Sequence, residues 1–301
     1  MAGATSSSPD VLITGCSAGF GEVIAKTAAL AGHRVFAGMR ETAGRNRDAA
    51  ETLHAWARAQ GLSLHVVEMD VADDESVTKA FDELQAMGAH LDVVVNNAGI
   101  AAMGPLESFD MDQVRYLYEV NVFGPIRVDK AALPGMRERR SGLLIHVSST
   151  LGRILPRSGG LYPASKWAVE GLAESLSYEV RPFGIDVVIL EPGAFPTTAT
   201  SRGLRPMGTD VAAEYAAAAA PRLQAGQPDS SYQLPNLQLI GDEVCRLISL
   251  PAGERPLRSV VGPIFTEGVA DYNAEYERVR DHMREVLRRP DQAVTWVQRR
   301  P

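Results

Sequence analysis

Two residues of the segment Tyr162-Pro163-Ala164-Ser165-Lys166 could perform acid–base chemistry together. Residues four apart on a helix project from the same face, about one turn apart. A free phenol has a pKa of about 10, and a neighbouring cation lowers that pKa by stabilising the phenolate. Tyr162 and Lys166 are therefore a candidate general acid/base pair. The alternative is a helix surface with an unrelated tyrosine and a lysine whose stem lies along apolar surface.

A glycine-rich turn near the start of the chain could bind a phosphate. The apolar run 11–13 predicts a buried strand, and an apolar stripe over 23–30 predicts a helix; between them lies Thr14-Gly15-Cys16-Ser17-Ala18-Gly19-Phe20-Gly21. A strand, a glycine-rich turn and a helix in this order offer backbone N–H groups and a helix N-terminus to an anion. The alternative is a plain tight turn.

The rest of the chain alternates apolar strands with helices. Strands are predicted at 34–38, 64–67, 91–95, 143–147, 185–190 and 258–262, and helices at 49–60, 76–87, 162–180, 210–220 and 242–250. Strands without polar alternation, separated by helices, indicate a parallel sheet covered on both faces. The predicted fold class is α/β, a Rossmann-type doubly wound parallel sheet of about seven strands with helices on both faces. Right-handed crossovers then place a ligand at the carboxyl ends of the strands.

A long helix is predicted over 111–136, with interruptions at Pro125 and Pro134. Proline has no N–H, so Pro125 deprives the carbonyl of Asn121, four residues back, of its helical partner. A carbonyl left free by such a kink can hold a water molecule. The alternative is a structural kink with no role in chemistry.

Composition narrows the possible partners. The 301 residues are 45% hydrophobic and carry a net charge of -7, which is ordinary for a soluble protein and argues against nucleic acid as the main partner. Cys16 and Cys245 are too few for a disulfide framework, and the six histidines lack metal-ligand spacing, so no metal is expected. Neither a secretory signal nor a membrane span is predicted, and a cytoplasmic location is expected.

The motifs occur together in the order and spacing of one family. They are Thr14-Gly15-x-x-x-Gly19-x-Gly21, Asn96-Asn97-Ala98-Gly99, Asn121, Ser149, Tyr162-x-x-x-Lys166 and Pro192-Gly193. In these motifs the chain resembles the short-chain dehydrogenases/reductases (SDR) over residues 10–265. The spacings of the glycines and of Tyr162 and Lys166 are similar to those of the classical, single-domain branch.

The resemblance implies a reaction and four catalytic residues. Tyr162 would exchange a proton with the substrate oxygen while hydride moves at the nicotinamide, and Lys166 would lower the tyrosine pKa and hold the cofactor ribose. Ser149 would position and polarise the carbonyl, and the backbone carbonyl of Asn121 would hold a water of the proton relay. The implied activity interconverts a ketone or aldehyde and an alcohol. Relatives that only sense the cofactor as regulators are the alternative, although they usually lack the tyrosine or the lysine.

The resemblance also implies the cofactor-binding residues. Besides Tyr162 and Lys166 they are Gly15, Ser17, Gly19, Phe20 and Gly21 at the pyrophosphate, Asp70 and Val71 at the adenine, Asn97 and Gly99 near the adenosine ribose, Phe195 and Thr197 at the carboxamide, and Arg40. NAD-dependent members end the second strand with an acid, whereas this chain has Met39 followed by Arg40. Because an arginine suits a 2′-phosphate, NADP(H) is the expected cofactor, although Glu41 could also approach the ribose.

The remaining expectations concern boundaries and substrate. We expect a disordered N-terminus over 1–9, a single domain over 10–265 and a C-terminal helical extension over 266–301, where apolar residues recur at intervals of three and four. The segment 194–236 would form a substrate-binding loop or lid. Together with Leu151, Ile154 and Leu155 it would wall a pocket for an apolar small-molecule substrate. Family habit implies a homodimer or homotetramer.

Overall fold

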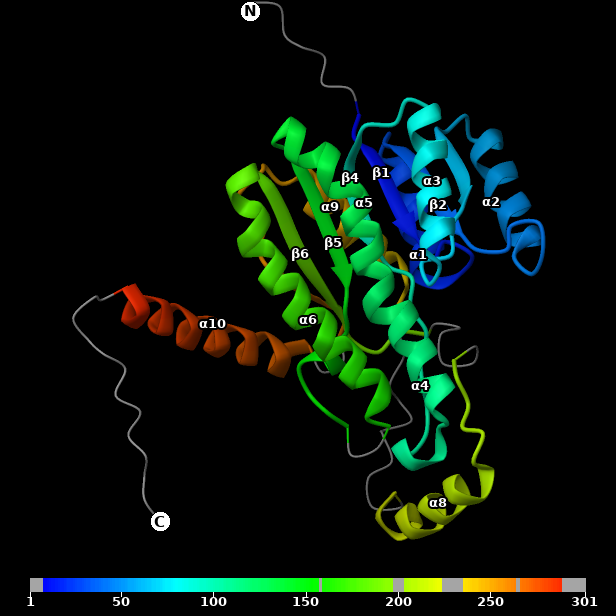
Figure 1. The fold of residues 1–301 in the computed structure, drawn as a ribbon, viewed down its shortest axis with the longest axis vertical. Helices are drawn as coiled ribbons and strands as arrows, with labels where there is room; N and C mark the ends of the chain where they lie inside the picture. Colours follow the sequence, from blue (N-terminus) through cyan, green and yellow to red (C-terminus); the bar gives the residue numbers. More distant parts are fainter. Residues whose placement is uncertain (1–7, 157–158, 197–202, 224–234, 264–265, 289–301) are drawn as a thin grey trace, which may run out of the picture.

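The computed structural model describes residues 8–156, 159–196, 203–223, 235–263 and 266–288. Their centre is a parallel sheet of seven strands in the order β3-β2-β1-β4-β5-β6-β7 (Figure 1). The strands are β1 (Asp10–Thr14), β2 (Arg34–Met39), β3 (Leu64–Glu68), β4 (Leu91–Asn96), β5 (Gly142–Val147), β6 (Ile185–Pro192) and β7 (Arg258–Val261). The predicted doubly wound sheet is confirmed, and each strand lies within two residues of its predicted bounds.

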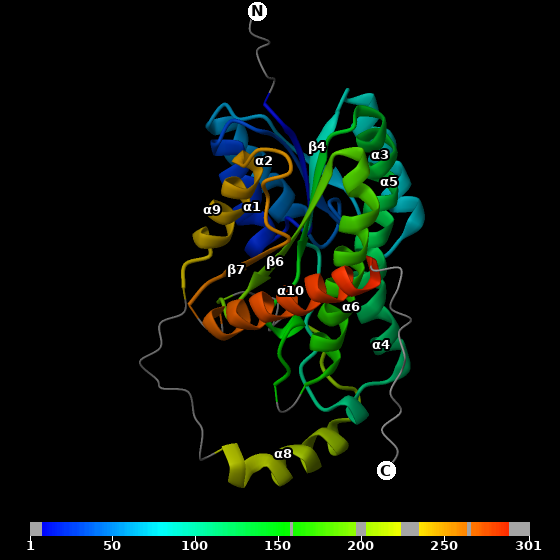
Figure 2. The same ribbon diagram turned by 90° about the vertical axis from the view of Figure 1, so that its left-hand side faces the viewer.

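Helices cover both faces of the sheet, as Figure 2 shows nearly edge-on. One face carries α1 (Gly19–Leu30), α2 (Arg47–Ala59) and α9 (Gln238–Ser249). The other carries α3 (Asp74–Ala86), α5 (Gly124–Arg139) and α6 (Leu161–Val180). Because both faces are covered, the central strands are buried along their length, which explains their continuous apolar sequences.

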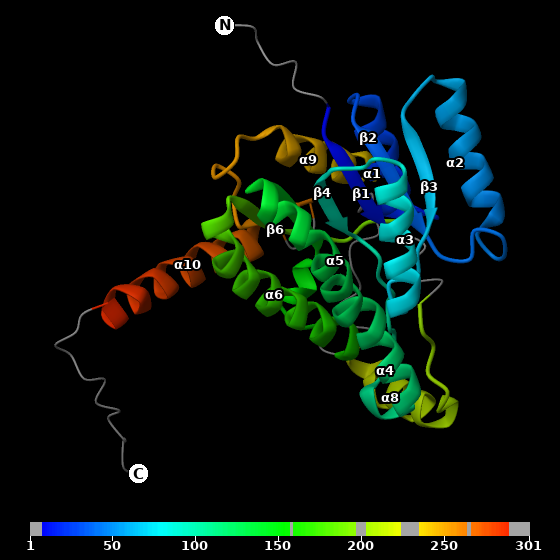
Figure 3. The same ribbon diagram turned by 45° about the horizontal axis from the view of Figure 1, so that its top comes forward.

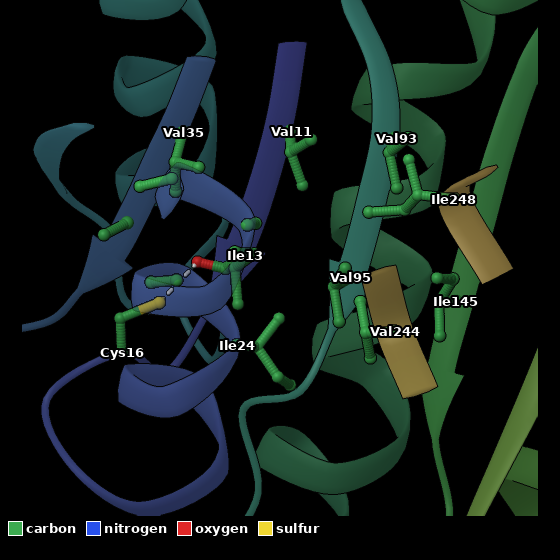
Figure 4. Close-up of a cluster of buried hydrophobic side chains, with 14 of the residues drawn as sticks. Val11, Ile13, Cys16, Ile24, Val35, Val93, Val95, Ile145, Val244 and Ile248 are labelled. Atoms are coloured by element: carbon green, nitrogen blue, oxygen red, sulfur yellow. Dashed lines mark hydrogen bonds between the residues drawn. The ribbon is translucent and has the colours of Figure 1, made fainter. Parts of the chain in front are cut away.

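The core consists of two apolar layers, one on each side of the sheet. Successive residues of a strand point to opposite faces. Thus Val11 and Ile13 of β1 pack in the layer under α1 and α9, with Ile24 and Val244 (Figure 4), while Leu12 packs in the opposite layer. These side chains are fully buried.

The strand order reverses between β1 and β4, which are hydrogen-bonded neighbours. From β1 the chain proceeds outward through β2 to β3, and it then returns to β4 and proceeds the other way. A crevice forms at the carboxyl ends of the strands where the order reverses, because the following connections diverge there. The glycine-rich turn after β1 and the Asn96-Asn97-Ala98-Gly99 segment after β4 both lie at this point.

The predicted long helix over 111–136 consists of three parts. Helix α4 (Met111–Tyr118) continues into a π-helical segment (Glu119–Phe123), and α5 then begins just before Pro125. The interruption predicted before Pro125 is confirmed. The one predicted at Pro134 is wrong, since α5 continues through it to Arg139. Pro134 and Lys130, whose carbonyl would lose its partner, are both exposed, so water can satisfy that carbonyl.

Two helices extend beyond the layered body. Helix α8 (Thr209–Leu223) lies beyond the carboxyl ends of the strands, and α10 (Thr266–Arg288) crosses the end of α6 and projects outward (Figures 1 and 3). The predicted lid 194–236 therefore contains a helix. Parts of it, 197–202 and 224–234, lie outside the described residues, as do the N-terminal residues 1–7. No helix among the described residues is long and apolar enough to cross a bilayer.

Candidate dinucleotide and acid–base site

The glycine-rich turn has the backbone that a phosphate site requires. Gly15 and Gly19 have φ values of +74° and +64°, in the left-handed region that favours glycine. Helix α1 starts at Gly19, and no side chain caps its first N–H groups, because Ala18 occupies the cap position. Uncapped N–H groups at a helix N-terminus attract an anion. The turn therefore fits the pyrophosphate of a dinucleotide.

Close backbone contacts hold this turn in place. A Cβ atom on Gly21 would lie 2.3 Å from the Gly15 carbonyl oxygen, so only glycine allows the helix to approach the turn. The Asn97 amide donates to the carbonyl oxygens of Thr14 at 2.8 Å and Gly15 at 3.3 Å. In return, the Thr14 hydroxyl oxygen accepts hydrogen bonds from the backbone N–H groups of Asn97 and Ala98. Asn97 thus joins the ends of β1 and β4 and stabilises the crevice between them.

The structure brings Ser149, Tyr162 and Lys166 together at the end of β5. Ser149 follows β5 directly, and its side chain forms a hydrogen bond with that of Tyr162, in the first turn of α6. Lys166 lies one turn further along α6, with Nζ 5.8 Å from the centre of the Tyr162 ring. Its ammonium donates to the carbonyl oxygen of Val147 at 2.8 Å. A hydroxyl pair and a buried cation therefore face the same crevice as the glycine-rich turn.

Burial dominates the acid–base properties of this group. Desolvation raises the pKa of Tyr162 to about 12, and the hydrogen bond with Ser149 opposes this rise. Desolvation lowers the pKa of Lys166 to about 8, against the attraction of Glu170 one turn further along the helix. At neutral pH the phenol is therefore protonated and can act as an acid, and most of the lysine still carries its positive charge.

The Asn121 side chain connects the segment after β4 to the helix that carries Tyr162. Its oxygen accepts from the Ile100 N–H at 2.8 Å, and its amide donates to the Ile100 carbonyl at 2.9 Å and to Ser165 Oγ at 3.0 Å. Gly99 lies between Asn121 and Lys166, since a Cβ there would be 3.4 Å from Asn121 Oδ1 and 3.6 Å from Lys166 Nζ. Gly99 is therefore also a packing residue at the reaction centre.

Arg40 lies just after β2, as predicted, and it already has partners in the protein. Its guanidinium donates to the Tyr116 hydroxyl and lies 3.9 Å from an Asp70 carboxylate oxygen. The next residue, Glu41, has a φ of +52°, and its N–H donates to the Glu68 carboxylate at 2.7 Å. Glu68 therefore holds the loop after β2 against β3, with Arg40 partly exposed beside it.

The other predicted cofactor residues are distributed around the crevice. Phe195, after β6, forms an edge-to-face ring contact with Phe20 of the glycine-rich turn, with centroids 5.4 Å apart. Val71 is buried against Gly124 of α5, where an added Cβ would lie 2.8 Å from a Val71 methyl. Ser17 is partly buried in the turn itself. Thr197 lies outside the described residues.

An apolar group adjoins Tyr162 on the side away from the sheet. Tyr162 packs against a cluster that contains Ala102, Phe109, Leu117 and Leu161, and Leu204 contacts the same cluster. The Leu204 N–H donates to the Ala101 carbonyl at 2.7 Å, so the segment before α8 lies along the loop that follows β4. Of the predicted pocket wall, Leu151 and Ile154 are half-buried and Leu155 is 65% exposed.

Two buried polar groups near the site were not predicted. Asp129 of α5 accepts a hydrogen bond from Asn96 at 2.7 Å and lies 3.4 Å from His146 Nε2. Five further buried polar residues surround Arg258 near the Ser149 turn. An acid or arginine inside an apolar segment indicates in the sequence that a buried charge is present. Its partners could not be predicted, because they come from elements distant in sequence. No group of three or more possible metal-ligating residues occurs among the described residues.

Comparisons with known proteins identify similar sequences. The sequence model of the family described as short chain dehydrogenase matches residues 10–207. Human retinol dehydrogenase 8 is 38% identical over 191 residues, which are 62% of this chain and 59% of the relative. A 3-ketodihydrosphingosine reductase of Bacteroides thetaiotaomicron is 35% identical over 187 residues, 62% of this chain and 64% of the relative. The chain therefore spans less than two thirds of these curated relatives.

Similar solved structures cover more of the chain. A short-chain dehydrogenase from Streptomyces avermitilis has a TM-score of 0.70 and 32% identity, covering 93% of this chain and 96% of the other. An alcohol dehydrogenase from the archaeon Thermococcus sibiricus, complexed with 5-hydroxy-NADP, has a TM-score of 0.67 and 26% identity. That likeness covers 84% of this chain and 95% of the other.

Proposed function

The chain belongs to the short chain dehydrogenase family, and we propose that it is an NADP(H)-dependent oxidoreductase that interconverts a carbonyl compound and its alcohol. The observation that carries this proposal is that Ser149 contacts Tyr162, with the Lys166 ammonium next to the Tyr162 ring. All three lie at the crevice that the glycine-rich turn lines. A hydroxyl pair beside a buried cation suits proton exchange with a carbonyl oxygen. The bound nicotinamide would supply or accept the hydride.

In the reducing direction, Tyr162 donates its phenolic proton to the substrate oxygen. The raised pKa keeps this proton in place at neutral pH. Ser149 donates a hydrogen bond to the same oxygen and places it within reach of the phenol. The positive charge of Lys166 then stabilises the phenolate that remains, because a nearby cation is strongly felt in a buried site. In this proposal Asn121 positions the backbone around Lys166 and, through its carbonyl, a water that returns the proton.

Arg40 supports the preference for NADP(H). It is the first residue after β2, where the adenosine ribose of a dinucleotide lies in this fold. A guanidinium there can bind a 2′-phosphate through charge-assisted hydrogen bonds. The Tyr116 hydroxyl holds the guanidinium at this edge, while Asp70 reduces the net positive charge. The NADP derivative bound by the Thermococcus sibiricus relative agrees with this choice.

The substrate that we propose is an apolar carbonyl compound. The cluster beside Tyr162 consists of apolar side chains, and exposed apolar residues continue from it towards α8: Met103, Leu106, Met111, Leu155 and Met207. Retinol dehydrogenase 8 and 3-ketodihydrosphingosine reductase, by their names, act on largely apolar molecules. Apolar walls near the reacting atoms favour such substrates by burying their surface.

We also propose that the protein forms a homodimer or homotetramer. Exposed apolar side chains lie on the outer surface of α6, among them Trp167, Leu172 and Tyr178. A cavity of about 230 Å³ between α5 and α6 is lined mostly by apolar residues. Exposed apolar side chains beside an apolar cavity favour association with another protein surface. Light scattering after size exclusion gives the mass directly, and a monomer at micromolar concentration would contradict this proposal.

The decisive test is turnover with a panel of ketones, aldehydes and alcohols, followed at the nicotinamide absorbance band with NADPH and with NADH. We expect Tyr162→Phe to lower kcat by about 10²- to 10⁴-fold, the usual contribution of general acid catalysis, with NADPH affinity retained. The matched control is Tyr118→Phe, which removes a partly buried phenol hydroxyl on α4. Unchanged activity of Tyr162→Phe would refute the mechanism. Tight NADPH binding without turnover on any substrate would instead indicate a cofactor-sensing regulator.

A further inference from the structure

A buried group of charged and amide side chains adjoins the turn that carries Ser149. We call it the Arg258 cluster. Its members are all less than a tenth exposed: Arg153, Glu170, Glu174, Glu191, Arg258 and Asn273. They come from five elements, namely the turn after Ser149, the helix α6, the strands β6 and β7, and the C-terminal helix α10.

Arg258 holds the helix that carries Tyr162 and Lys166. Its Nε lies 3.0 Å from a carboxylate oxygen of Glu170, and its Nη2 lies 2.6 Å from one of Glu174, both on α6. The same Nε is 3.5 Å from Glu191 Oε1 at the end of β6. One arginine therefore connects β7 to α6 and to β6 through directed, charge-assisted contacts.

Arg153 connects the same cluster to α10. Its Nε donates to Asn273 Oδ1 at 2.8 Å, and the Asn273 amide in turn donates to Glu191 Oε2 at 2.6 Å. The Arg153 guanidinium also lies 4.7 Å from the ring centres of both Tyr272 and Tyr276. Three side chains of α10 therefore hold one arginine, by a hydrogen bond and by two cation–π contacts.

Arg153 is also part of the turn that carries Ser149. Its N–H donates to the Thr150 carbonyl at 3.1 Å, and the Gly152 N–H donates to the Ser149 carbonyl at 2.8 Å. Gly152 packs against α6, since a Cβ there would lie 3.1 Å from Glu170 Cγ. The cluster therefore contacts both elements of the reaction centre, the serine turn and the helix of Tyr162.

The Arg258 cluster is better suited to holding its elements in fixed positions than to stabilising the fold. Buried ion pairs often stabilise a fold no better than apolar side chains of the same volume, because each charge loses its hydration. The contacts that Arg153 and Arg258 make are directional, and they fix distances and angles between the elements they join. A cluster of this kind is well suited to holding two elements in a defined register.

We propose that Arg153 is a positioning residue for Ser149, and that Asn273 of α10 holds it in place. The C-terminal helix is then part of the support of the reaction centre, although it lies outside the crevice. This inference rests on the proposed oxidoreductase function. Release of Arg153 loosens the serine turn relative to α6, and the contact between Ser149 and Tyr162 is then formed in only a fraction of molecules.

The test compares Asn273→Leu with Ala274→Leu in the full chain. Ala274 is the next residue on α10 and is exposed, so the control adds the same side chain without touching the cluster. We expect kcat of Asn273→Leu to fall about 10- to 100-fold, as misplacement of a reacting group does, with NADPH affinity within about twofold of the unmodified protein. Arg153→Lys, which keeps the charge, should retain more activity than Arg153→Met.

Hydrogen exchange supplies a readout that does not depend on turnover. The amides of 149–154 should exchange faster in Asn273→Leu than in Ala274→Leu, while the amides of β1 and β4 exchange equally. Equal exchange and equal kcat in the two variants would overturn the proposal. So would a parallel loss of kcat, NADPH affinity and melting temperature, which indicates general destabilisation. If the unmodified protein turned over no carbonyl compound, the proposed function would fail, and the exchange comparison would still decide whether α10 holds the turn.

Discussion

The pair of Asp129 and His146 predicts a specific dependence of stability on pH. Asp129 is 5% exposed and His146 is 3% exposed, and both line the cavity between α5 and α6. Burial raises the pKa of Asp129 to about 8, against a hydrogen bond from Asn96 that lowers it. Burial, together with the nearby charge of Lys166, lowers the pKa of His146 to about 4. Both side chains are therefore uncharged in the folded protein at neutral pH.

The two groups act in opposite directions on the free energy of unfolding. Between pH 4 and 8 the unfolded chain has lost the Asp129 proton that the folded chain keeps, so stability falls by up to about 1.4 kcal/mol per pH unit. Between pH 4 and 6.5 the unfolded chain binds a proton at His146 that the folded chain does not, so stability rises with a similar slope. These effects offset each other below pH 6.5. Above it Asp129 acts alone, and stability falls by up to about 2 kcal/mol between pH 6.5 and 8.

The substitution Asp129→Asn tests this reasoning, because asparagine has the shape of a protonated aspartate and does not titrate. Urea unfolding of the original protein and of the variant at pH 6.5, 7.0, 7.5 and 8.0 gives the difference at each pH. We expect Asp129→Asn to gain stability relative to the original protein across this range. Glu191, whose pKa burial also raises to about 8, is present in both proteins and cancels in the difference. Asp112→Asn is the exposed control, with a side chain 93% exposed.

A constant difference between Asp129→Asn and the original protein at all four pH values would refute the assignment of a neutral, protonated Asp129. A difference that grows equally for Asp112→Asn would attribute the effect to net charge instead. Neither outcome depends on the cofactor or the substrate, so the test stands independently of the proposed function.

Two further predictions concern the dinucleotide site. Gly21→Ala places a methyl group 2.3 Å from the Gly15 carbonyl oxygen. We therefore expect NADPH affinity, measured by fluorescence titration, to fall at least about tenfold, and the free energy of unfolding to fall by about 1–3 kcal/mol. Retained affinity would contradict the close packing. Its control, Gly171→Ala, lies on α6 with open space around its Cβ and should instead gain about 0.5–1 kcal/mol in thermal unfolding. Arg40→Ala should weaken NADPH binding by about 10- to 100-fold and leave NADH binding unchanged; equal losses for both would exclude recognition of a 2′-phosphate.

Sequence patterns predicted the sheet because they depend on local physics. Continuous apolar runs, glycines before helices and Pro125 after Asn121 each constrain the backbone within a few residues of themselves. The parallel arrangement then follows from the handedness of crossovers, and with it the meeting of the glycine-rich turn and the Tyr162 helix at one edge. Helix periodicity alone placed Tyr162 and Lys166 on one face. That Ser149 meets them was implied by the resemblance to the short-chain dehydrogenases/reductases.

The partners of buried charges could not be predicted in the same way, because they depend on which distant elements become neighbours. Arg258 opens a strand and Glu191 ends another, and nothing local indicates that Glu170 of α6 meets both. Arg40 likewise has the predicted position, but its contact with Tyr116 arises from α4, 76 residues later.

Some residues of the proposed site lie within the part of the chain that matches the family, and others lie beyond it. The glycine-rich turn, Ser149, Tyr162 and Lys166 lie within the part of the chain that matches the family, residues 10–207. Arg258 and Asn273, which hold the Ser149 turn and its helix from behind, lie beyond it. If Arg153 positions Ser149 as proposed, a fragment that ends after residue 207 would contain every reacting group and lack the support that fixes their register. Turnover in this protein would then depend on α10 as well as on the residues that touch the substrate.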